Sequence, residues 1–414
     1  MGERRTALVV GGSLGGLFAA NLLARAGWDV EVFERAGVAL AGRGAGIITH
    51  DELFDAMRRA GAMIDATIGC ATQGRVTLDR AGHVLAELPM VQILAAWGSL
   101  YGLMKGVFPA DRYHFNKSLV HVEQNATTVT AHFEDGSQAS GDLLVGADGI
   151  RSTVRAQFLP QARPVYSGYL AWRGLADERA VNDETRRTLA GRMAFCLPPG
   201  EQMLTYLVAA RDNSTRAGER RINFVWYRPA DANTELSDLC TDAGGRHYAH
   251  NIPPDRIRPH VITDMHAAAA RLLAPQFVDV VRTTAKPLFQ PIYDLESAQL
   301  VFGRVALLGD AAFVARPHVG LGVTKAAGDA VALAAALLAH PHDIDSALMQ
   351  YADRRLEFGK AIVAHARLLG EGIGAPVASS ARAAYFRRPG VLMREVAVPD
   401  WAERAIALRR LKVA

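Results

Sequence analysis

The chain has 414 residues, of which 50% are hydrophobic and 21% are charged, and its formal net charge is +4. This composition is globular and provides enough apolar material for a large core or two fused domains. The basic residues are spread thinly, with no run of five or more, which argues against nucleic-acid binding.

The cysteine content and the distribution of apolar residues indicate where in the cell the protein is expected. Cys70, Cys196 and Cys240 are an odd number without CxxC spacing, so we expect no disulfide framework and no metal site. The apolar run Ala7–Ala24 is broken by glycines, and no stretch reaches the ~18 uninterrupted apolar residues of a membrane span. We therefore expect a soluble, cytoplasmic protein without membrane contact.

The N-terminal segment has the pattern of a mononucleotide-binding unit. Thr6–Val10 is a short apolar strand, Gly11–Gly16 a glycine turn, Leu17–Ala26 a helix and Val30–Phe33 a second strand. A strand, turn, helix and strand of these lengths form one βαβ unit, which predicts a Rossmann-type α/β domain.

Further along, the apolar stretch Val91–Leu103 is expected to be a helix, and the region 161–285 alternates with period two, which indicates an antiparallel sheet. Val305–Leu308 then returns the chain to the first domain, and a helix follows over Thr324–Leu338. The other expected strands are Ser118–Val122, Thr127–Phe133, Asp142–Gly146, Met203–Val208 and Ile222–Tyr227.

These elements predict an α/β fold, with a Rossmann-type nucleotide-binding domain interrupted by an α+β substrate domain with an antiparallel sheet, plus C-terminal helices. The expected divisions are 1–75, 98–160 and 286–340 for the nucleotide domain, 76–97 and 161–285 for the sheet domain, and 341–414 for the helical region. The end of this region, Trp401–Leu411, could pack on a partner subunit in a homodimer or form a solvated final helix.

The glycine turn predicts a pyrophosphate site. In the GxGxxG register Ser13 replaces the second glycine, and a small residue there still allows backbone N–H groups to approach a phosphate at the helix N-terminus. Glu34 ends the second strand and can accept both ribose hydroxyls. Arg35 could indicate a ribose phosphate, but the Glu34 carboxylate would repel one. The expected nucleotide contacts are Gly11, Ser13, Leu14, Gly16, Glu34 and Arg35.

Two later motifs also end strands at a sheet edge. Leu143–Gly146 leads into Asp148-Gly149 and a helix start with Ser152 and Arg155. The strand before Gly309 delivers Asp310, which can bond the hydroxyls of a ribityl chain. The helix after it directs the N–H groups of Gly322, Val323 and Thr324 toward a flavin pyrimidine carbonyl, where its dipole favours the anionic reduced ring.

Together, the three motifs resemble those of the class A flavoprotein aromatic hydroxylases, which have the para-hydroxybenzoate hydroxylase-like fold. The likeness spans about residues 6 to 338. Tyr166–Gly174, Arg221–Tyr227 and the Arg316-Pro317-His318 run are similar to the branch that contains 2,6-dihydroxypyridine 3-hydroxylase. By matching position the resemblance implies a loop along the flavin ring, namely Arg43, Gly44, Ala45, Gly46 and Ile47, and a backbone contact to adenine from Val120.

The chain departs from the family pattern at three places. Phe313 stands where His or Val is common, Leu321–Thr324 replaces a Gln-Gly-Ala-Asn run, and Trp97 replaces an arginine that commonly contacts FAD. These differences bear on the surroundings of the isoalloxazine and the substrate.

The resemblance implies that FAD binds non-covalently, that NADH or NADPH reduces it, and that O2 is activated as a flavin C4a-hydroperoxide which hydroxylates a small aromatic ring of hydroxypyridine or phenol type. The chain has no second strand–GxGxxG–helix unit, since Gly370–Gly374 follows a helical stretch. The resemblance implies that NAD(P)H binds transiently near Asp148–Arg155, without a Rossmann domain of its own.

An aromatic hydroxyl reacts best as its anion, so a general base is useful. His50, just past the flavin loop, is the first candidate for the base, and Tyr227 and His318 are candidates for hydrogen bonding to the substrate. Each could instead be structural, and Tyr169, Trp172 and Arg173 are more often packing residues. Two alternatives stay open, another FAD oxidoreductase such as an epoxidase, halogenase or reductase, and a non-catalytic flavin-binding regulator.

Overall fold

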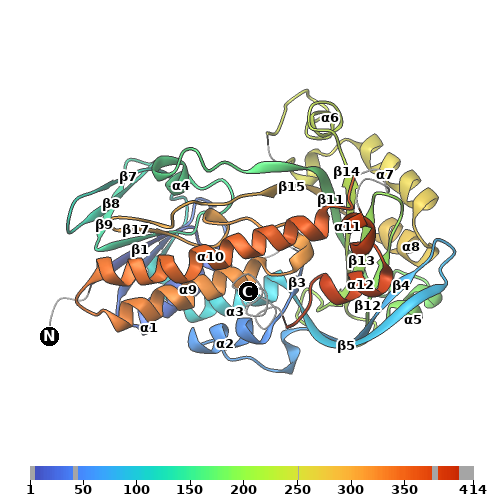
Figure 1. Ribbon diagram of the computed structural model, residues 1–414, viewed down its shortest axis with the longest axis horizontal. Coiled ribbons are helices and arrows are strands. Elements are labelled where there is room, and N and C mark those ends of the chain that lie inside the picture. Colours follow the sequence, from blue (N-terminus) through green and yellow to red (C-terminus); the bar gives the residue numbers. More distant parts are fainter. Residues whose placement is uncertain (1–4, 41–44, 250, 375–380, 401–414) are drawn as a thin grey trace.

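The computed structural model describes residues 5–40, 45–249, 251–374 and 381–400. Its first layer is a six-stranded sheet of order β16-β17-β10-β1-β2-β6, shown at the left of Figure 1. All neighbours pair in parallel except β16 with β17. The strands are β1 (Thr6–Val10), β2 (Asp29–Phe33), β6 (Tyr113–His114), β10 (Leu143–Gly146), β16 (Val301–Phe302) and β17 (Val305–Leu307).

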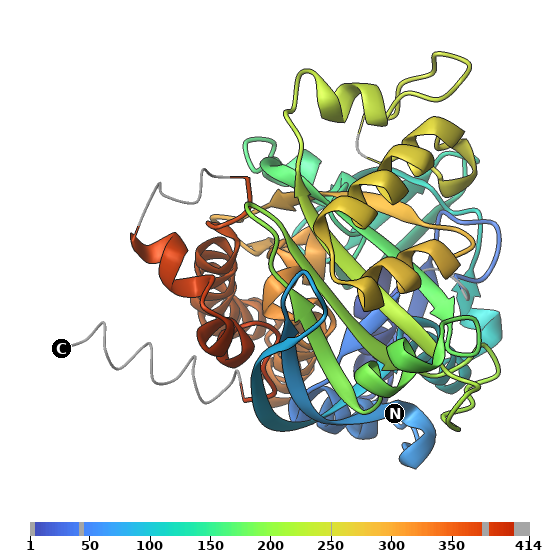
Figure 2. The same cartoon turned by 90° about the vertical axis from the view of Figure 1, so that its right-hand side faces the viewer.

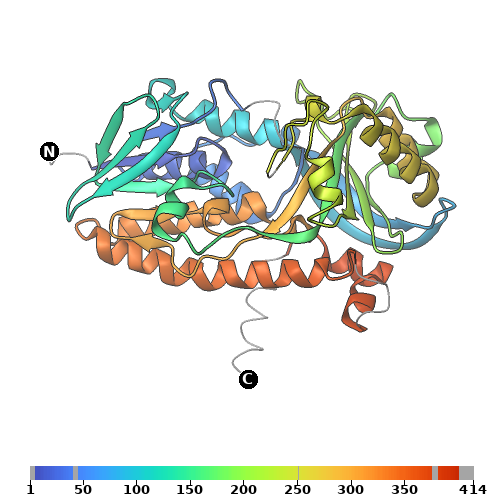
Figure 3. The same cartoon turned by 90° about the horizontal axis from the view of Figure 1, so that it is seen from above.

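Apolar residues on both faces of this sheet explain its position in the core. The residues of β10 and β17 are all buried, as expected for parallel strands covered on two sides. Helix α1 (Leu14–Arg25) packs against α9 (Gly322–Ala339), which packs against α10 (Ile344–Gly370). Figure 3 shows α10 running along both halves of the molecule.

A small three-stranded sheet lies beside the first. Its strands β7 (Leu119–Gln124), β8 (Val129–Phe133) and β9 (Gln138–Gly141) form an antiparallel meander. Alternate residues point inward, so Val122, Ala131 and Phe133 are buried in the same core. Helix α4 (Thr153–Phe158) packs against β7.

An eight-stranded sheet of order β15-β11-β14-β13-β12-β4-β5-β3 forms the other half. Helices α7 (Pro259–Leu272) and α8 (Pro275–Thr283) cover one face, as seen in Figure 2. The opposite face packs against residues of α10 and the segment before α9. The strands are β3 (Gly46–Ile48), β4 (Cys70–Leu78), β5 (Val84–Ala96), β11 (Val165–Asp177), β12 (Arg192–Cys196), β13 (Gln202–Val208), β14 (Arg221–Pro229) and β15 (Leu288–Asp294).

The remaining helices connect or flank these layers. They are α2 (Asp51–Arg59), α3 (Trp97–Val107), α5 (Asp183–Leu189), α6 (Glu235–Leu239), α11 (Ala381–Phe386) and α12 (Pro389–Glu395), with single 3₁₀ turns η1 (Ala66–Ile68), η2 (Ala110–Arg112), η3 (Pro254–Arg256), η4 (Gly309–Ala311) and η5 (Pro317–Val319).

The sequence prediction was wrong in one detail. Val91–Leu103 is not one helix, because β5 continues to Ala96 and pairs with β3 and β4 before α3 begins at Trp97. A short apolar run does not distinguish a buried strand from a helix. The large sheet also contains one parallel pair, β4 with β12. The expected boundary at residue 75 falls inside β4, and the domain divisions stay a prediction.

Among the described helices, α9 is long and apolar enough to span a membrane by length and composition. It is 56% buried inside the protein and carries Lys325 and Asp329, so it is a core helix. The three cysteines are all free and buried, as the sequence predicted. Trp401–Leu411 lies outside the described residues, and the homodimer contact predicted for it stays a prediction.

Candidate functional site

A cavity of about 420 Å³ opens at the carboxyl ends of the parallel strands. Ligands of open α/β sheets bind at this edge. The cavity brings together the glycine turn, the Asp-Gly motif after β10 and Asp310 after β17, which are far apart in the sequence. Its lining residues are Val10, Gly11, Ser13, Phe33, Glu34, Arg35, Leu40, Trp97, Lys117, Ser118, Leu119, Ala147, Asp148, Gly149, Ile150, Arg151, Thr153 and Asp310.

The glycine turn is shaped for close backbone approach. Gly11 has φ +103°, and a Cβ there would lie 2.4 Å from the Ala147 carbonyl oxygen. A Cβ on Gly16 would lie 1.8 Å from the carbonyl oxygen of Gly11. Both positions therefore require glycine. Ser13 precedes the first residue of α1, so the helix N-terminus faces the cavity, as an anion site requires.

Glu34 lies at the end of β2, and backbone donors orient its carboxylate. Its Oε2 accepts from the Gly12 N–H at 2.8 Å and its Oε1 from the Ala36 N–H at 2.9 Å. Each carboxylate oxygen retains a further lone pair for a hydroxyl group. The side chain is buried, 7% exposed, beside the glycine turn, which is the placement that a ribose contact needs.

Asp148 also lies against the cavity. Its Oδ2 accepts from the Thr153 N–H at 2.7 Å, whereas its buried Oδ1 has no hydrogen-bond partner among the described residues. Burial raises the pKa of this carboxyl, and its hydrogen bonds oppose the shift. Arg155 lies behind the motif, where its guanidinium donates to the Ala311 carbonyl at 3.0 Å and thus connects the Asp-Gly motif to η4.

A buried charge network positions Asp310. The N–H of Gly309, whose φ is +62°, donates to the Asp329 carboxylate at 3.0 Å. Arg355 donates to the other Asp329 oxygen at 2.6 Å, and Lys325 lies 3.8 Å from the carboxylate. This network fixes η4 so that Asp310 lines the cavity. Helix α9 begins at Gly322, and Val323 and Thr324 form the rest of its first turn.

These features fit an FAD molecule. Glycine at positions 11 and 16 lets the turn close tightly beside the cavity, and Asp148 presents a buried oxygen without a partner among the described residues. Glu34, beside the glycine turn, supplies the acceptor for a ribose.

The flavin loop predicted from the sequence is described only in part. Arg43 and Gly44 lie outside the described residues, whereas Ala45, Gly46 and Ile47 lead into or form β3 at the edge of the large sheet. The Gly46 N–H donates to Asn223 Oδ1 at 3.1 Å, and a Cβ on Gly46 would lie 2.4 Å from the Tyr206 ring. The described part of the loop, Ala45–Ile47, therefore lies against the large sheet.

His50, the candidate base, has both ring nitrogens engaged. Its Nδ1 lies 2.8 Å from Thr324 Oγ1 and its Nε2 lies 3.1 Å from the Val398 carbonyl oxygen. Burial lowers the pKa of His50 to about 4, although Val398 and two acidic neighbours oppose the shift. The imidazole therefore joins α2 to α9, and in this conformation it has no free nitrogen for a substrate.

Tyr227 and His318, which the sequence paired as substrate contacts, do lie together. Their ring centroids are 4.1 Å apart, and His318 Nε2 lies 2.9 Å from the Tyr169 hydroxyl. Burial, followed by repulsion from Arg316 and Arg173, lowers the pKa of His318 to about 3. Burial raises the pKa of Tyr227 to about 12 despite Arg173. At neutral pH both groups are therefore uncharged.

Around this pair, the sequence favoured a packing role for Arg173 and did not single out Gln202 or Tyr206. Arg173 shares a sheet face with Tyr169 by strand periodicity, and its buried Nε makes no hydrogen bond. Asn223 Nδ2 and Gln202 Nε2 are likewise buried without partners among the described residues. We call this set the polar sheet face; it consists of Arg173, Gln202, Tyr206, Asn223 and Tyr227.

Several cavity residues were also missed or placed differently. The cavity is also lined by Lys117, Ser118 and Leu119, which follow β6 at the same edge of the sheet. Their place in the site could be predicted only from the order of the strands in the sheet. Val120, the predicted adenine contact, lies at a β-bulge directly after them. Trp97 lines the cavity and stacks on Tyr101 with centroids 5.0 Å apart.

Comparisons with known proteins agree with this geometry. Residues 4–175 and 262–366 match the FAD binding domain family, and residues 166–294 match an FAD binding domain-like family. A 2,6-dihydroxypyridine 3-monooxygenase from Paenarthrobacter nicotinovorans is 32% identical over 85% of this chain and 87% of that protein. A 6-hydroxynicotinate 3-monooxygenase from Bordetella bronchiseptica is 27% identical over 78% of this chain and 80% of its own.

Solved structures show the same likeness. The 2,6-dihydroxypyridine-3-hydroxylase of Arthrobacter nicotinovorans superposes with a TM-score of 0.84 at 30% identity, covering 91% of this chain and 95% of its own. Klebsiella pneumoniae HpxO, complexed with FAD and uric acid, has a TM-score of 0.77 at 25% identity and covers 97% of this chain and 95% of its own.

Proposed function

Because the chain belongs to the FAD binding domain family and is a class A flavoprotein aromatic monooxygenase, we propose that its substrate is a small hydroxylated N-heteroaromatic ring of the hydroxypyridine type, bound as an anion. The observation that carries this proposal is Arg173, a guanidinium on an aromatic sheet face with no acidic partner among the described residues. The named relatives that act on hydroxypyridines support the choice of ring.

FAD occupies the cavity in this proposal. The glycine turn and the start of α1 hold its pyrophosphate, Glu34 its adenosine ribose, and Asp310 its ribityl chain. The start of α9 and the Ala45–Ile47 segment then lie beside its ring, next to the polar sheet face. When bound, FAD supplies electron transfer from NADH or NADPH and the activation of O2.

Charge on the polar sheet face favours an anionic substrate. Arg173 lies close enough to His318, Tyr206 and Tyr227 to perturb each of them. None of these neighbours is an anion at neutral pH, since burial raises the pKa of both tyrosines and lowers that of His318. Arg173 is half-buried and its Nε has no hydrogen-bond partner among the described residues, so a deprotonated hydroxypyridine would supply a charged acceptor for it.

Donors on the same face then orient the ring. The free Nδ2 of Asn223 and Nε2 of Gln202 can donate to ring oxygens, and Tyr227 keeps its proton and can donate as well. His50 has no free nitrogen here, so we propose that it positions α9 and that the site selects the anion from solution. Aromatic rings from Tyr169 and Tyr206 exclude water from the same region.

The experiment uses the FAD-loaded protein and a panel of hydroxypyridines, hydroxybenzoates, urate and neutral pyridines. We expect NADH or NADPH oxidation and oxygen uptake to be accelerated by acidic hydroxypyridines, with a product one oxygen atom heavier. Acceleration by neutral rings alone would contradict the substrate proposal. A yellow protein that no panel member stimulates would favour a flavin-binding regulator instead.

The proposal includes the compartment in which the protein works. Three free, buried cysteines and the use of NAD(P)H support a cytoplasmic location.

A further inference from the structure

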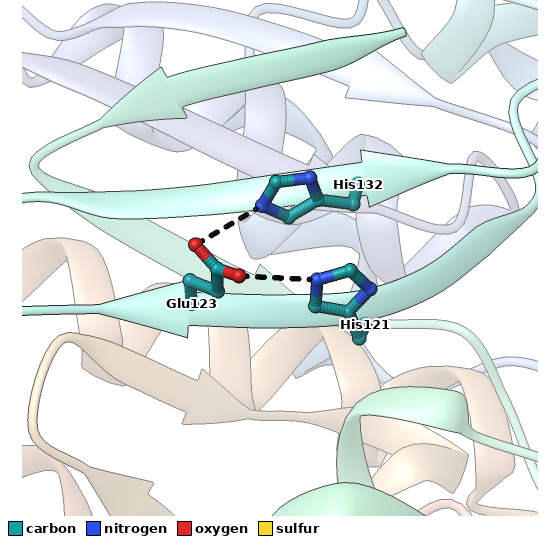
Figure 4. Close-up of side chains that lie close together, drawn as sticks. All are labelled: His121, Glu123 and His132. Carbon is teal, nitrogen blue, oxygen red and sulfur yellow. Dashed lines mark hydrogen bonds and ion pairs between the residues drawn. The ribbon is translucent and has the colours of Figure 1, made fainter. Parts of the chain in front are cut away.

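We propose that His121, Glu123 and His132 bind one zinc-type divalent metal ion on the exposed face of the β7–β8 hairpin. This site lies outside the FAD cavity and does not depend on the hydroxylation proposed above. Figure 4 shows the Glu123 carboxylate between the two imidazoles, with one oxygen facing each ring. The sequence predicted no metal ligands, because His132 meets the other two residues only when the strands pair.

A β-bulge creates the arrangement. Leu119 opposes Phe133, but the register shifts before His121, which opposes His132. The extra residue reverses the alternation, so that Val122 becomes the inward residue and His121 and Glu123 both face outward. Without the bulge, His121 would share the inward face of Leu119. The bulge therefore presents two ligands from one strand beside a third from the next.

The separations match a metal site. Nε2 of His121 lies 3.4 Å from one Glu123 oxygen, and Nε2 of His132 lies 3.5 Å from the other. The three ligand atoms lie within 4.8 Å of one another. Ligands about 2.0–2.1 Å from a tetrahedral zinc ion are separated by roughly 3.3 Å. Two imidazole nitrogens and a carboxylate, completed by water, are a ligand set that zinc uses.

Without an ion, the contacts within this cluster do not satisfy the hydrogen-bonding capacity of its imidazole nitrogens. The contacts of 3.4 and 3.5 Å are long for hydrogen bonds, and the buried Nε2 of His132 makes none. The two rings stack with centroids 4.2 Å apart and an interplanar angle of 6°. An imidazole binds a metal through the lone pair in its ring plane, so binding one ion requires the rings to rotate until both Nε2 lone pairs point at it. An ion between the three groups would provide each with a strong partner.

A bound ion would also clamp β7 to β8 close to the nucleotide. Leu119 lines the FAD cavity and lies two positions before His121. Because the ion binds the folded hairpin, thermal stability should rise with metal concentration by mass action. This gives a second readout that does not involve catalysis.

The test is calorimetric titration of untagged, FAD-loaded, EDTA-treated protein with zinc chloride. We expect one ion per chain and affinity more than about tenfold weaker in both His121→Gln and His132→Gln, because even outer-shell partners of metal ligands contribute tenfold or more. His83→Gln is the matched control, since His83 pairs with Asp79 at 3.4 Å on the surface without a second histidine. It should leave affinity unchanged.

Flavin absorbance and circular dichroism, unchanged in all three variants, would establish that they are folded. Cobalt(II) should give the absorption bands of a tetrahedral complex in the original protein and lose them in His132→Gln. The proposal is overturned if binding is not saturable, or if both histidine variants bind zinc as the original protein does.

Discussion

The Nε2 atom of His318 lies 2.9 Å from the hydroxyl oxygen of Tyr169, and both side chains are fully buried. Nε2 of a neutral imidazole can accept from a hydroxyl group, so we assign the tyrosine proton to this contact and the acceptor role to His318 Nε2. This assignment places the single N–H proton of the neutral ring on Nδ1, which has no partner among the described residues. His318 therefore offers one N–H donor toward Tyr227 and the polar sheet face.

Replacing Tyr169 with Phe removes the donor that fixes this tautomer. We expect the free energy of unfolding to fall by about 1–3 kcal/mol, because His318 Nε2 is left buried and unsatisfied. Substrate affinity should fall as well, since the Nδ1 proton is no longer fixed. Urea unfolding and substrate titration of the FAD-loaded protein measure the two effects.

The control for this change is Tyr166→Phe. Tyr166 is on the same strand, and its hydroxyl donates to the Ala230 carbonyl at 2.9 Å, away from the polar sheet face. It should lose some stability and keep substrate affinity. Equal loss of substrate affinity in both variants would contradict the assigned tautomer.

Arg173 tests the anionic substrate. Arg173→Gln should raise the substrate dissociation constant roughly 10- to 100-fold for acidic hydroxypyridines, corresponding to the ~1.5–3 kcal/mol of a hydrogen bond to a charged group. Neutral ring analogues should lose much less, and flavin content should not change. Arg192→Gln is the control, because Arg192 is on the same sheet but pairs with Glu87 at the surface. A similar loss for neutral and acidic rings would contradict the electrostatic role.

Glu34 tests the nucleotide end of the cavity. Glu34→Gln places an amide N–H against the N–H of Gly12 or Ala36, so FAD affinity should fall by about tenfold or more. Flavin fluorescence during titration of the apoprotein measures this affinity. Glu31→Gln, on the same strand but paired with Arg112 near the surface, should retain FAD. Full FAD affinity in Glu34→Gln would remove Glu34 from the proposed ribose contact.

Two buried histidines predict how stability depends on pH. The pKa of His50 is lowered to about 4 and that of His318 to about 3, against 6.5 in the unfolded chain. Between these values the unfolded state binds more protons, so stability is complete above pH 6.5 and is lost as pH falls. Each histidine adds a slope of up to ~1.4 kcal/mol per pH unit.

Urea unfolding at several pH values between 7.5 and 5 measures this slope. His50→Asn should reduce it, and the exposed His83→Gln should leave it unchanged. If the free energy of unfolding depends on pH equally steeply in both variants and in the original protein, then groups other than His50 determine the loss of stability in acid.

The sequence predicted the nucleotide half well because local signals determine it. The glycine turn, the strand-end carboxylates Glu34 and Asp310 and the start of α9 all follow from strand–turn–helix patterns. The second half depends on pairing across long distances. Neither the bulge at His121 nor the position of Arg173, whose Nε has no hydrogen-bond partner in the described part of the chain, can be recognised from residue type, because each follows from strand register.

The role of His50 shows the same limit. Its place after the flavin loop suggested a base, but its contacts come from Thr324 and Val398, which are distant in sequence. Burial and pairing, rather than residue type, determine whether an imidazole can accept a proton near pH 7.

The most direct test of the central claim is turnover of the FAD-loaded protein with NADH or NADPH, 2,6-dihydroxypyridine and oxygen-18 gas, followed by mass spectrometry of the product. We predict one hydroxyl group carrying oxygen-18 on the ring, formed in step with nicotinamide oxidation. The contradicting result is oxidation of NADH or NADPH that yields only hydrogen peroxide, while 2,6-dihydroxypyridine and every other acidic hydroxypyridine are recovered unchanged.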